Sequence, residues 1–403
     1  MISLYILTQR QLFLQHVAQT SDAPLALEIE NAEGVYLYDV TGKKYIDLIS
    51  GIGVSALGHC HPKIVEAIQS QATKYAHTLV YGEFIQSPQV QLAKYLTDLL
   101  PSTLSSVYFT NSGTEATEGA MKLAKRFTGR TEIISCFNSY HGSTQGALSL
   151  NGDEYFKSAY RPLLPDIRQI RYNNFEDINL ITKKSAAIFL EPVQAEAGVI
   201  VPEAEYLKAI RKRCDETGTL LVFDEIQTGC GRTGNLFCFQ SENVIPDILL
   251  TGKAFGGGLP LAAFVSSNEI MQVLQNNPVL GHITTFGGNA VCCAAGLASL
   301  KEIEEHKLYA GAEAKAHLFM QLLQHKAIQK ISHCGLMMAV HLDNFDNLRK
   351  VIHECLGNGL VTDWFLFANN CMRIAPPLII TEDEIRVSCA IINNALEKVY
   401  KDV

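Results

Sequence analysis

The sequence predicts an α/β protein in which a mostly parallel central sheet is flanked by helices, with a smaller α+β domain beside it. Three observations lead to this prediction. From about residue 107 to residue 266, short apolar runs alternate with helical stretches. The runs are apolar throughout rather than at every second residue, which is typical of strands that helices cover on both faces. After about His306, helical stretches mix with short strands, which indicates a separate, smaller unit.

The elements of the repeating region follow in a regular order. SVYFT precedes the helical stretch NSGTEATEGAMKLAKR, and TEIISCF precedes a polar turn. AAIFLEP ends a strand before an acidic loop, EAEYLKAIRKRCDETG is helical, and TLLVFDE and DILLTGK are apolar runs with polar ends. Function in such sheets gathers at the carboxyl ends of the strands. This rule selects residues 111–115, 140–144, 191–196 and 224–227, together with Lys253.

The two ends of the chain are expected to form the smaller domain together. GVYLYDVTGKKYIDLISG alternates apolar and polar residues like a hairpin, with TGK as its turn. A chain of 403 residues exceeds one typical core, so a large domain with a smaller companion is expected. We predict an N-terminal segment (1–50) that joins the small domain, a large domain (51–305) and a C-terminal small domain (306–403).

Composition limits the kind of partner. The 33 basic and 41 acidic residues give a formal charge of -8, which argues against nucleic-acid and membrane-surface partners because both need a basic patch. A small-molecule partner is expected instead. Eleven cysteines without CxxC pairs indicate reduced thiols and a cytoplasmic location. MISLYILTQR lacks a basic region and a cleavage-type tail, so we predict no signal peptide, and no run is long enough for a membrane span.

A candidate phosphate site follows the first strand of the repeating region. Ser112, Gly113 and Thr114 lie between a strand and a helix, where free backbone N–H groups, two hydroxyls and the positive end of the helix meet. This combination suits a phosphate. The same residues also fit an ordinary helix cap, in which Ser112 or Thr114 caps the helix and Glu115 completes a capping box.

The acidic pair that ends LVFDE needs a partner, because a carboxylate at the edge of a buried sheet is costly when it is unpaired. Asp224 or Glu225 could face a metal ion, an arginine or a protonated heterocyclic nitrogen. Glu191 and Glu196 are nearby in sequence, but no matching histidine cluster accompanies them, so we expect no metal. HCHP, residues 59–62, also suggests a metal, yet adjacent side chains on an extended segment diverge, which favours a structural role.

Lys253 lies in TGKAFGGGLP, where the glycines follow the lysine and alanine comes directly after it. A Walker phosphate loop has the opposite order and a following Ser or Thr, so that interpretation fails. A phosphate site, a carboxylate for a protonated ring nitrogen and a lysine at a third strand end together describe pyridoxal phosphate chemistry. The lysine would form a Schiff base with the cofactor aldehyde and later carry a proton, while the carboxylate keeps the ring nitrogen protonated.

Several stretches, in this order, resemble the class III, ornithine-type aminotransferases of pyridoxal-phosphate fold type I over essentially the whole length. They are GIGVSALGHCHP, TNSGTEATEGAMKLAK, SYHG, EPVQAEAGV, VFDEIQTGCGRTG, TGKAFGGGLP, TTFGGN and RIAPPLIIT. The resemblance implies Lys253 as the Schiff-base residue and Asp224 as the partner of the pyridine nitrogen. It further implies cofactor contacts from Ser112, Gly113, Thr114, Tyr140, His141, Gln227 and Thr285. Because Thr285 would reach the phosphate of the partner subunit, a homodimer with shared active sites is expected.

Within that family, GIGVSALGH is most similar to the acetylornithine and ornithine aminotransferases, which move a terminal amino group to 2-oxoglutarate. The resemblance implies that Arg373 binds a substrate carboxylate and that Glu196 pairs with Arg373 between half-reactions. A planar guanidinium suits bidentate binding of a carboxylate. The resemblance also places Val54 and Ser143 in the substrate site.

Two departures from the family pattern concern the substrate. The pattern FHGRT is YHGST here, so Ser143 replaces an arginine that helps to hold an α-carboxylate. Losing such a contact costs roughly 2 to 5 kcal/mol of binding for a substrate that needs it, so the donor either lacks an α-carboxylate or places it elsewhere. The GEGG-like turn has Ala195 and Ala197 here, which either narrow the pocket beside Glu196 or change the freedom of its backbone.

Other activities of the same family remain open at this stage. They are transamination of 4-aminobutyrate or of another ω-amino acid or amine, an amino-group mutase, a decarboxylase, and a protein that binds pyridoxal phosphate without catalysis. Dependence on an oxo-acid acceptor separates transamination from the others.

Overall fold

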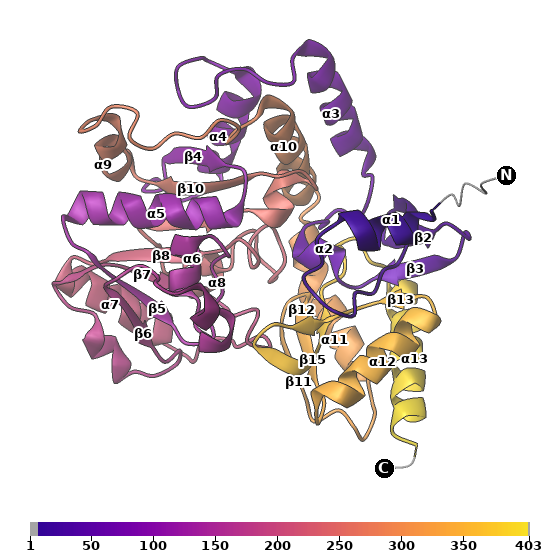
Figure 1. Cartoon of the computed structure of the whole chain (residues 1–403). Coiled ribbons are helices and arrows are strands. Elements are labelled where there is room, and N and C mark those ends of the chain that lie inside the picture. The colour runs from indigo at the N-terminus through magenta and orange to yellow at the C-terminus, as the bar shows by residue number, and fades with distance from the viewer. Residues whose placement is uncertain (1–6, 402–403) are drawn as a thin grey trace.

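The computed structural model describes residues 7–401, and its largest element is a seven-stranded sheet (Figure 1). The strand order is β4-β10-β9-β8-β7-β5-β6. The strands are β4 Ser106–Thr110, β5 Glu132–Cys136, β6 Ile167–Ile170, β7 Ser185–Leu190, β8 Leu220–Asp224, β9 Ile248–Thr251 and β10 Ala262–Ser266. Only β10 runs antiparallel to its neighbours. The predicted α/β class with a mostly parallel sheet is confirmed.

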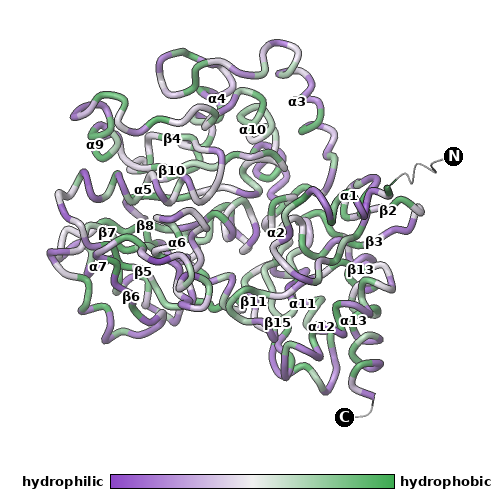
Figure 2. The backbone as a smooth tube through the Cα atoms, in the orientation of Figure 1, coloured by the Kyte–Doolittle hydropathy of each residue, from purple (hydrophilic) through white to green (hydrophobic). Residues whose placement is uncertain are grey.

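The central strands are apolar throughout because both of their faces are buried. Every residue of β7, β8, β9 and β10 is buried. Along β7, Ala187 and Phe189 pack into one hydrophobic cluster with α5, whereas Ile188 and Leu190 pack into the other. Alternate side chains of a strand point to opposite faces, so a continuous apolar run is needed when helices cover both. Figure 2 shows this concentration of hydrophobic residues along the central strands.

Helices cover both faces of this sheet, and two of them, α5 and α7, lie where the sequence predicted helical stretches. The principal ones are α3 Pro62–Lys74, α4 Ser87–Asp98, α5 Gly113–Thr128, α7 Tyr206–Thr217 and α10 Ala290–Glu305. The α5 helix packs on β10, β9 and β7, and α10 packs on α3 and α4. Shorter helices are α6 Gln145–Leu150, α8 Phe239–Glu242 and α9 Asn268–Met271, with 3-10 turns η1 Glu154–Phe156, η2 Ser158–Tyr160, η3 Asp177–Leu180, η4 Lys253–Gly256, η5 Gln272–Gln275 and η6 Leu308–Gly311.

Two four-stranded sheets lie beside the large one, on the side where both chain ends are found (Figure 1). The first has the order β1-β2-β3-β13 and the second β11-β12-β15-β14. Their strands are β1 Ile29–Glu33, β2 Tyr36–Asp39, β3 Lys44–Asp47, β11 Lys330–Cys334, β12 Met337–His341, β13 Leu360–Val361, β14 Trp364–Phe365 and β15 Ala368–Ile374. The helices here are α1 Gln9–His16, α2 Ser50–Gly53, α11 Ala312–Leu322, α12 Phe345–Gly357 and α13 Glu382–Val399.

The N-terminal segment shares a sheet with the C-terminal part of the chain. The β2–β3 hairpin lies where the sequence predicted one, and β13 pairs with β3 in parallel, with Leu360 opposite Ile46. His59 lies beside this sheet and bonds Asp47, at 2.9 Å between Nε2 and Oδ2. The domain boundaries at 50/51 and 305/306 remain a proposal that this shared sheet supports.

Two further sequence predictions concern a signal peptide and a membrane-spanning helix. The segment MISLYILTQR, for which we predicted no signal function, has its first six residues outside the described range. Within residues 7–401, no helix is both long enough and apolar enough to cross a bilayer.

The close packing of α5 on β10 gives a stability prediction. A Cβ added at Gly119 would lie 2.3 Å from Cε1 of Phe264, which is buried in β10. We therefore expect Gly119→Ala to destabilise the fold by about 1–3 kcal/mol through overpacking, although alanine favours a helix. The helical Gly357 has nothing within 4 Å of an added Cβ, so Gly357→Ala is the matched control. Thermal unfolding should show a lower midpoint for the first variant alone, and equal midpoints would contradict the predicted overpacking.

Candidate active site

A cavity of about 300 Å³ lies at the carboxyl ends of the central strands. It is lined by Gly113, Thr114, Tyr140, His141, Gly142, Ser143, Glu191, Glu196, Asp224, Ile226, Gln227, Thr228 and Lys253. These residues follow β4, β5, β7, β8 and β9, which end at the same edge of the sheet. The structure thus brings together nine of the thirteen predicted site residues. It adds Gly142, Glu191, Ile226 and Thr228 to them; Ile226 and Thr228 flank Gln227 in the quoted DEIQT run.

Lys253 points its amine into this cavity from the first position of the 3-10 turn after β9. Its φ of +48° is unusual for a residue with a side chain, and such strain is characteristic of functional sites. Burial lowers the pKa of Lys253 from 10.5 to about 8. The Nζ atom donates a hydrogen bond to Oε1 of Gln227 at 3.0 Å. Gly257, with φ +60°, allows the turn to approach α10, since a Cβ there would be 2.9 Å from the carbonyl oxygen of Ala295.

Asp224 and His141 form a buried pair at the floor of the cavity, with 2.7 Å between Oδ2 and Nδ1. Burial alone would lower the pKa of His141, but the hydrogen bond and charge of Asp224 outweigh it and raise that pKa. The other carboxylate oxygen accepts from the Ile226 backbone N–H at 3.1 Å. Hydrogen bonds from His141 and from the Ile226 backbone thus hold the Asp224 carboxylate at the cavity, where it suits a cationic ring nitrogen.

The neighbouring Glu225 has a different role. Its carboxylate is fully buried and accepts hydrogen bonds from the backbone N–H groups of Cys238 and Phe239, both at 2.7 Å, and from Thr228. Burial raises its pKa to about 7. Glu225 thus fixes the loop after β8, and only Asp224 of the acidic pair lines the cavity.

Glu191 joins two segments that border the cavity. Its carboxylate accepts hydrogen bonds from the backbone N–H of Tyr140 at 2.9 Å and from that of Ala195 at 3.0 Å. Burial, opposed by the charge of His141 and aided by that of Asp224, raises its pKa to about 7. The loop that presents Tyr140 and the loop that presents Glu196 are therefore held by one side chain.

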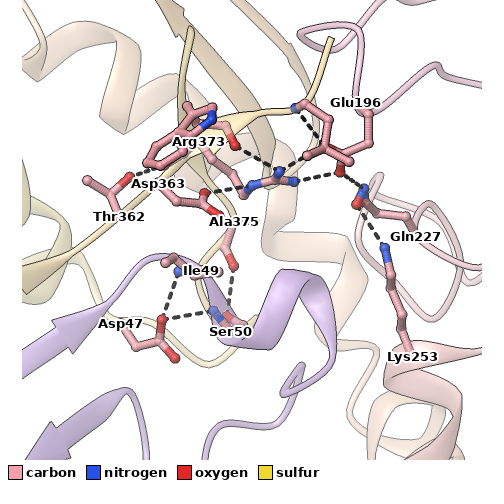
Figure 3. Close-up of polar contacts among 12 residues, drawn as sticks. Asp47, Ile49, Ser50, Glu196, Gln227, Lys253, Thr362, Asp363, Arg373 and Ala375 are labelled. Carbon is pink, nitrogen blue, oxygen red and sulfur yellow. Dashed lines mark hydrogen bonds and ion pairs between the residues drawn. The ribbon is translucent and has the colours of Figure 1, made fainter. Parts of the chain in front are cut away.

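Arg373 and Glu196 form a buried bidentate ion pair, with nitrogen–oxygen distances of 3.1 and 3.0 Å (Figure 3). Burial alone would raise the pKa of Glu196, but the charge of Arg373 outweighs it and lowers that pKa. Asp363 accepts from Nε of Arg373 at 2.8 Å. Gln227 donates to Glu196 at 3.2 Å, so one polar chain runs from Lys253 through Gln227 and Glu196 to Arg373. Arg373 lies behind Glu196 and does not line the cavity.

The candidate phosphate site lies at the N-terminus of α5. Gly113 and Thr114 line the cavity, whereas Ser112 caps the helix by accepting from the Glu115 backbone N–H at 3.4 Å. The Glu115 carboxylate bonds the N–H of Asn111 rather than that of Ser112, so the reciprocal capping box is not formed. The two uses of this segment are compatible, because the cap employs the side chain of Ser112, whereas an anion would contact Gly113 and Thr114.

Two predicted residues lie away from the cavity. Val54 caps the short helix α2 and is half-buried, and Thr285 is exposed in the segment before α10. Neither lines the cavity of its own chain. Their predicted roles stay predictions, and that of Thr285 concerns a second subunit.

Comparisons with known proteins agree with this arrangement. The family model described as "Aminotransferase class-III" matches residues 17–396. The acetylornithine aminotransferase of Methanopyrus kandleri is 38% identical, over 90% of this chain and 92% of its own length, and that of Methanocaldococcus jannaschii is 38% identical, over 94% of each. This chain belongs to the class III aminotransferases.

Solved structures show the same fold. An ornithine aminotransferase from Toxoplasma gondii, with pyridoxal phosphate at partial occupancy, superposes with a TM-score of 0.90 at 30% identity, covering 97% of this chain and 93% of the other. The omega transaminase of Pseudomonas jessenii in complex with PMP gives 0.90 at 25% identity, covering 98% of each. Family membership therefore implies an enzyme that transfers amino groups with pyridoxal phosphate, as the motifs predicted.

The lowered pKa of Lys253 gives a prediction for the cofactor-free protein. Only the neutral amine is nucleophilic, so with a pKa of about 8 half of Lys253 is reactive at pH 8, against less than about 1% of an ordinary lysine. Competitive acetylation with acetic anhydride, read by peptide mass spectrometry, should show Lys253 reactivity that rises through pH 8 and then levels off. In denaturant its titration should return to about pH 10.4. The same curve in folded and unfolded protein would contradict the shift.

Proposed function

We propose that this transaminase moves a terminal, δ- or ω-amino group to a 2-oxo acid, with 2-oxoglutarate as the acceptor. The observation that supports it best is the buried Glu196–Arg373 pair beside the amine of Lys253. A substrate carboxylate can replace Glu196 on Arg373 without leaving the guanidinium unpaired. The relatives that are acetylornithine and ornithine aminotransferases also favour a terminal amino group.

The donor groups around the cavity fit the chemical parts of pyridoxal phosphate. The Lys253 amine suits the aldehyde, the Asp224 carboxylate suits the ring nitrogen, and the N-terminus of α5 at Gly113 and Thr114 suits the phosphate. A Cβ at Gly142 would lie 2.4 Å from Oγ1 of Thr114, so glycine keeps that hydroxyl accessible. When bound, the cofactor supplies an electron-accepting ring that stabilises negative charge at the substrate carbon.

The protein's own residues then have the following roles. We infer that Lys253 anchors the cofactor and carries the proton between carbon atoms, for which a pKa of about 8 is suited because both protonation states are populated. Asp224, supported by His141, keeps the ring nitrogen protonated. Tyr140 borders the ring site, and Gln227 keeps the Lys253 amine oriented. Glu196 screens Arg373 while the amino donor is bound and releases it for the oxo acid.

A second candidate is transamination of donors without an α-carboxylate, such as 4-aminobutyrate or simple amines, and Ser143 favours it. Its hydroxyl lies 3.0 Å from that of Tyr140, at the position where the family arginine would hold an α-carboxylate. The basic side chains that line the cavity are those of Lys253 and His141, and Arg373, which is paired with Glu196, does not line it. An α-carboxylate thus has no free arginine there within one chain.

We also propose a homodimer with shared sites. The segment that contains Thr285 exposes Val279, Leu280, Ile283 and Phe286, and the separate segment before α4 exposes Ile85, which is 95% exposed. Apolar side chains exposed in this way are expected to be covered by another subunit. Analytical ultracentrifugation would measure the mass of the protein in solution, which should be that of two chains.

A cytoplasmic location stays a prediction of the cysteine composition.

Removing the amine tests the central role of Lys253. We expect Lys253→Ala to lower turnover by at least about 10²–10⁴-fold, because the proton carrier is lost. Lys94→Ala, which removes an exposed lysine paired with Asp98, is the control and should be fully active.

Wild-type enzyme loaded with cofactor and given donor alone should transfer about one amino group per site and stop. Full turnover without an oxo acid would instead indicate a mutase or decarboxylase.

Restoring the arginine tests the donor class. Ser143→Arg should raise kcat/KM for ornithine, acetylornithine and lysine relative to 4-aminobutyrate and simple amines, by about tenfold or more, through a bidentate contact with the α-carboxylate. Ser143→Ala removes the hydroxyl without adding charge and should leave the ratio unchanged. A donor panel with 2-oxoglutarate and pyruvate measures both. If wild type already prefers the α-carboxylate donors by as much as the arginine variant does, the second candidate fails.

A further inference from the structure

A cluster of two histidines and one glutamate lies outside the active site, between helix α11 and strand β11. Glu313 and His317 are four residues apart on α11, so they share one face of the helix. His333 comes from β11, the edge strand of its sheet, which packs beside α11 (Figure 1). None of the three lines the cavity that contains Lys253.

The three side chains point their donor atoms at one another. Nε2 of His317 is 3.5 Å from Oε1 of Glu313, and Nδ1 of His333 is 3.8 Å from the same oxygen. One ligand atom from each residue lies within 4.8 Å of the other two. Nδ1 of His333 is buried without a hydrogen-bond partner among the described residues. A buried imidazole nitrogen without a partner is uncommon in folded proteins, and a bound ion at this position would supply the partner.

We propose that Glu313, His317 and His333 bind a divalent transition-metal ion of the Zn²⁺ type, with water completing the coordination. Two imidazole nitrogens and one carboxylate oxygen form a set that Zn²⁺ binds tetrahedrally at about 2.0–2.2 Å, which puts ligand atoms roughly 3.3 Å apart. The two separations from Glu313 are 3.5 and 3.8 Å, and the separation between the two imidazoles is within 4.8 Å. Glu313 and His317 are 51% and 58% exposed, so their side chains can rotate by the small amount that closure requires.

A second cluster of the same residue types shows what would prevent binding. Glu302 lies 3.6 Å from His306 and 3.9 Å from His61, but Lys63 also forms a close ion pair with its carboxylate. The ammonium group of Lys63 already pairs with the Glu302 carboxylate, and its positive charge would repel a metal ion. Glu313 has no lysine or arginine ion partner among the described residues, so its charge remains for the metal.

A bound ion would link α11 to the edge strand of the sheet that carries Arg373. The order β11-β12-β15 places β11 two strands from Arg373, which is too remote for catalysis but able to stabilise the sheet. The expected effect is therefore on stability and not on turnover, because a ligand that binds only the folded state stabilises it. This inference does not rest on the proposed substrate.

The test uses the cofactor-loaded full chain and Zn²⁺ alone. Because Cys60 exposes its thiol, all proteins carry Cys60→Ser. After treatment with a chelator, calorimetric titration should show one high-affinity Zn²⁺ per chain. Glu313→Gln and His317→Ala, both exposed positions, and His333→Ala should each weaken binding by roughly tenfold or more, while His306→Ala should not. Co²⁺ should give visible bands typical of a tetrahedral site, and these bands should be lost in the same three variants.

Transaminase activity serves as the check of folding, since the ligands lie outside the catalytic cavity. Activity equal to that of the parent in Glu313→Gln and His317→Ala, together with weakened Zn²⁺ binding, supports the site. Absence of stoichiometric Zn²⁺ binding in the parent would overturn the proposal, and so would binding that these two variants leave unchanged. In either case the three residues form only an ion-paired cluster.

Discussion

The buried pair of Arg373 and Glu196 is the interaction on which the arrangement of the active site depends. Arg373 belongs to β15 in a small sheet, and Glu196 belongs to the loop after β7 in the large one. Burying two charges costs several kcal/mol per ion, which their attraction barely offsets, so the pair contributes little net stability. In the function that we propose, Arg373 exchanges one carboxylate for another while it keeps its hydrogen bond to Asp363.

The remaining charges of the cavity are balanced around this pair. Gln227 contacts both Glu196 and Lys253, so a change at the arginine reaches the amine through two side chains, Glu196 and Gln227. Glu191 and Lys253 have pKa values of about 7 and 8, both within about one pH unit of neutrality. Burial shifts the two in opposite directions, since it disfavours the charged form of each. The cavity can therefore accept or release a proton at little cost.

The order of strands and helices, and the residues at the strand ends, could be predicted from the sequence. Continuous apolar runs such as β7 and β8 reveal burial on both faces, and this property is local to each run. Because parallel strands end at one edge, the convergence of Asp224 and Lys253 followed from topology alone. The resemblance added Arg373 and its pairing with Glu196, which no spacing rule would have joined.

Other features were decided only by tertiary structure. The local pattern left open which residue of the Asp224–Glu225 pair faces the cavity, a choice that the resemblance alone made, and it gave no sign that His141 supports Asp224. Glu313 and His317 have the spacing of a helical pair, but their nearness to His333 depends on how α11 packs against β11. The sequence by itself determined the elements, their order and the chemistry at their ends, because these follow from local patterns. The partners of buried charges were fixed only on folding, because segments far apart in the chain must meet before desolvation selects among them.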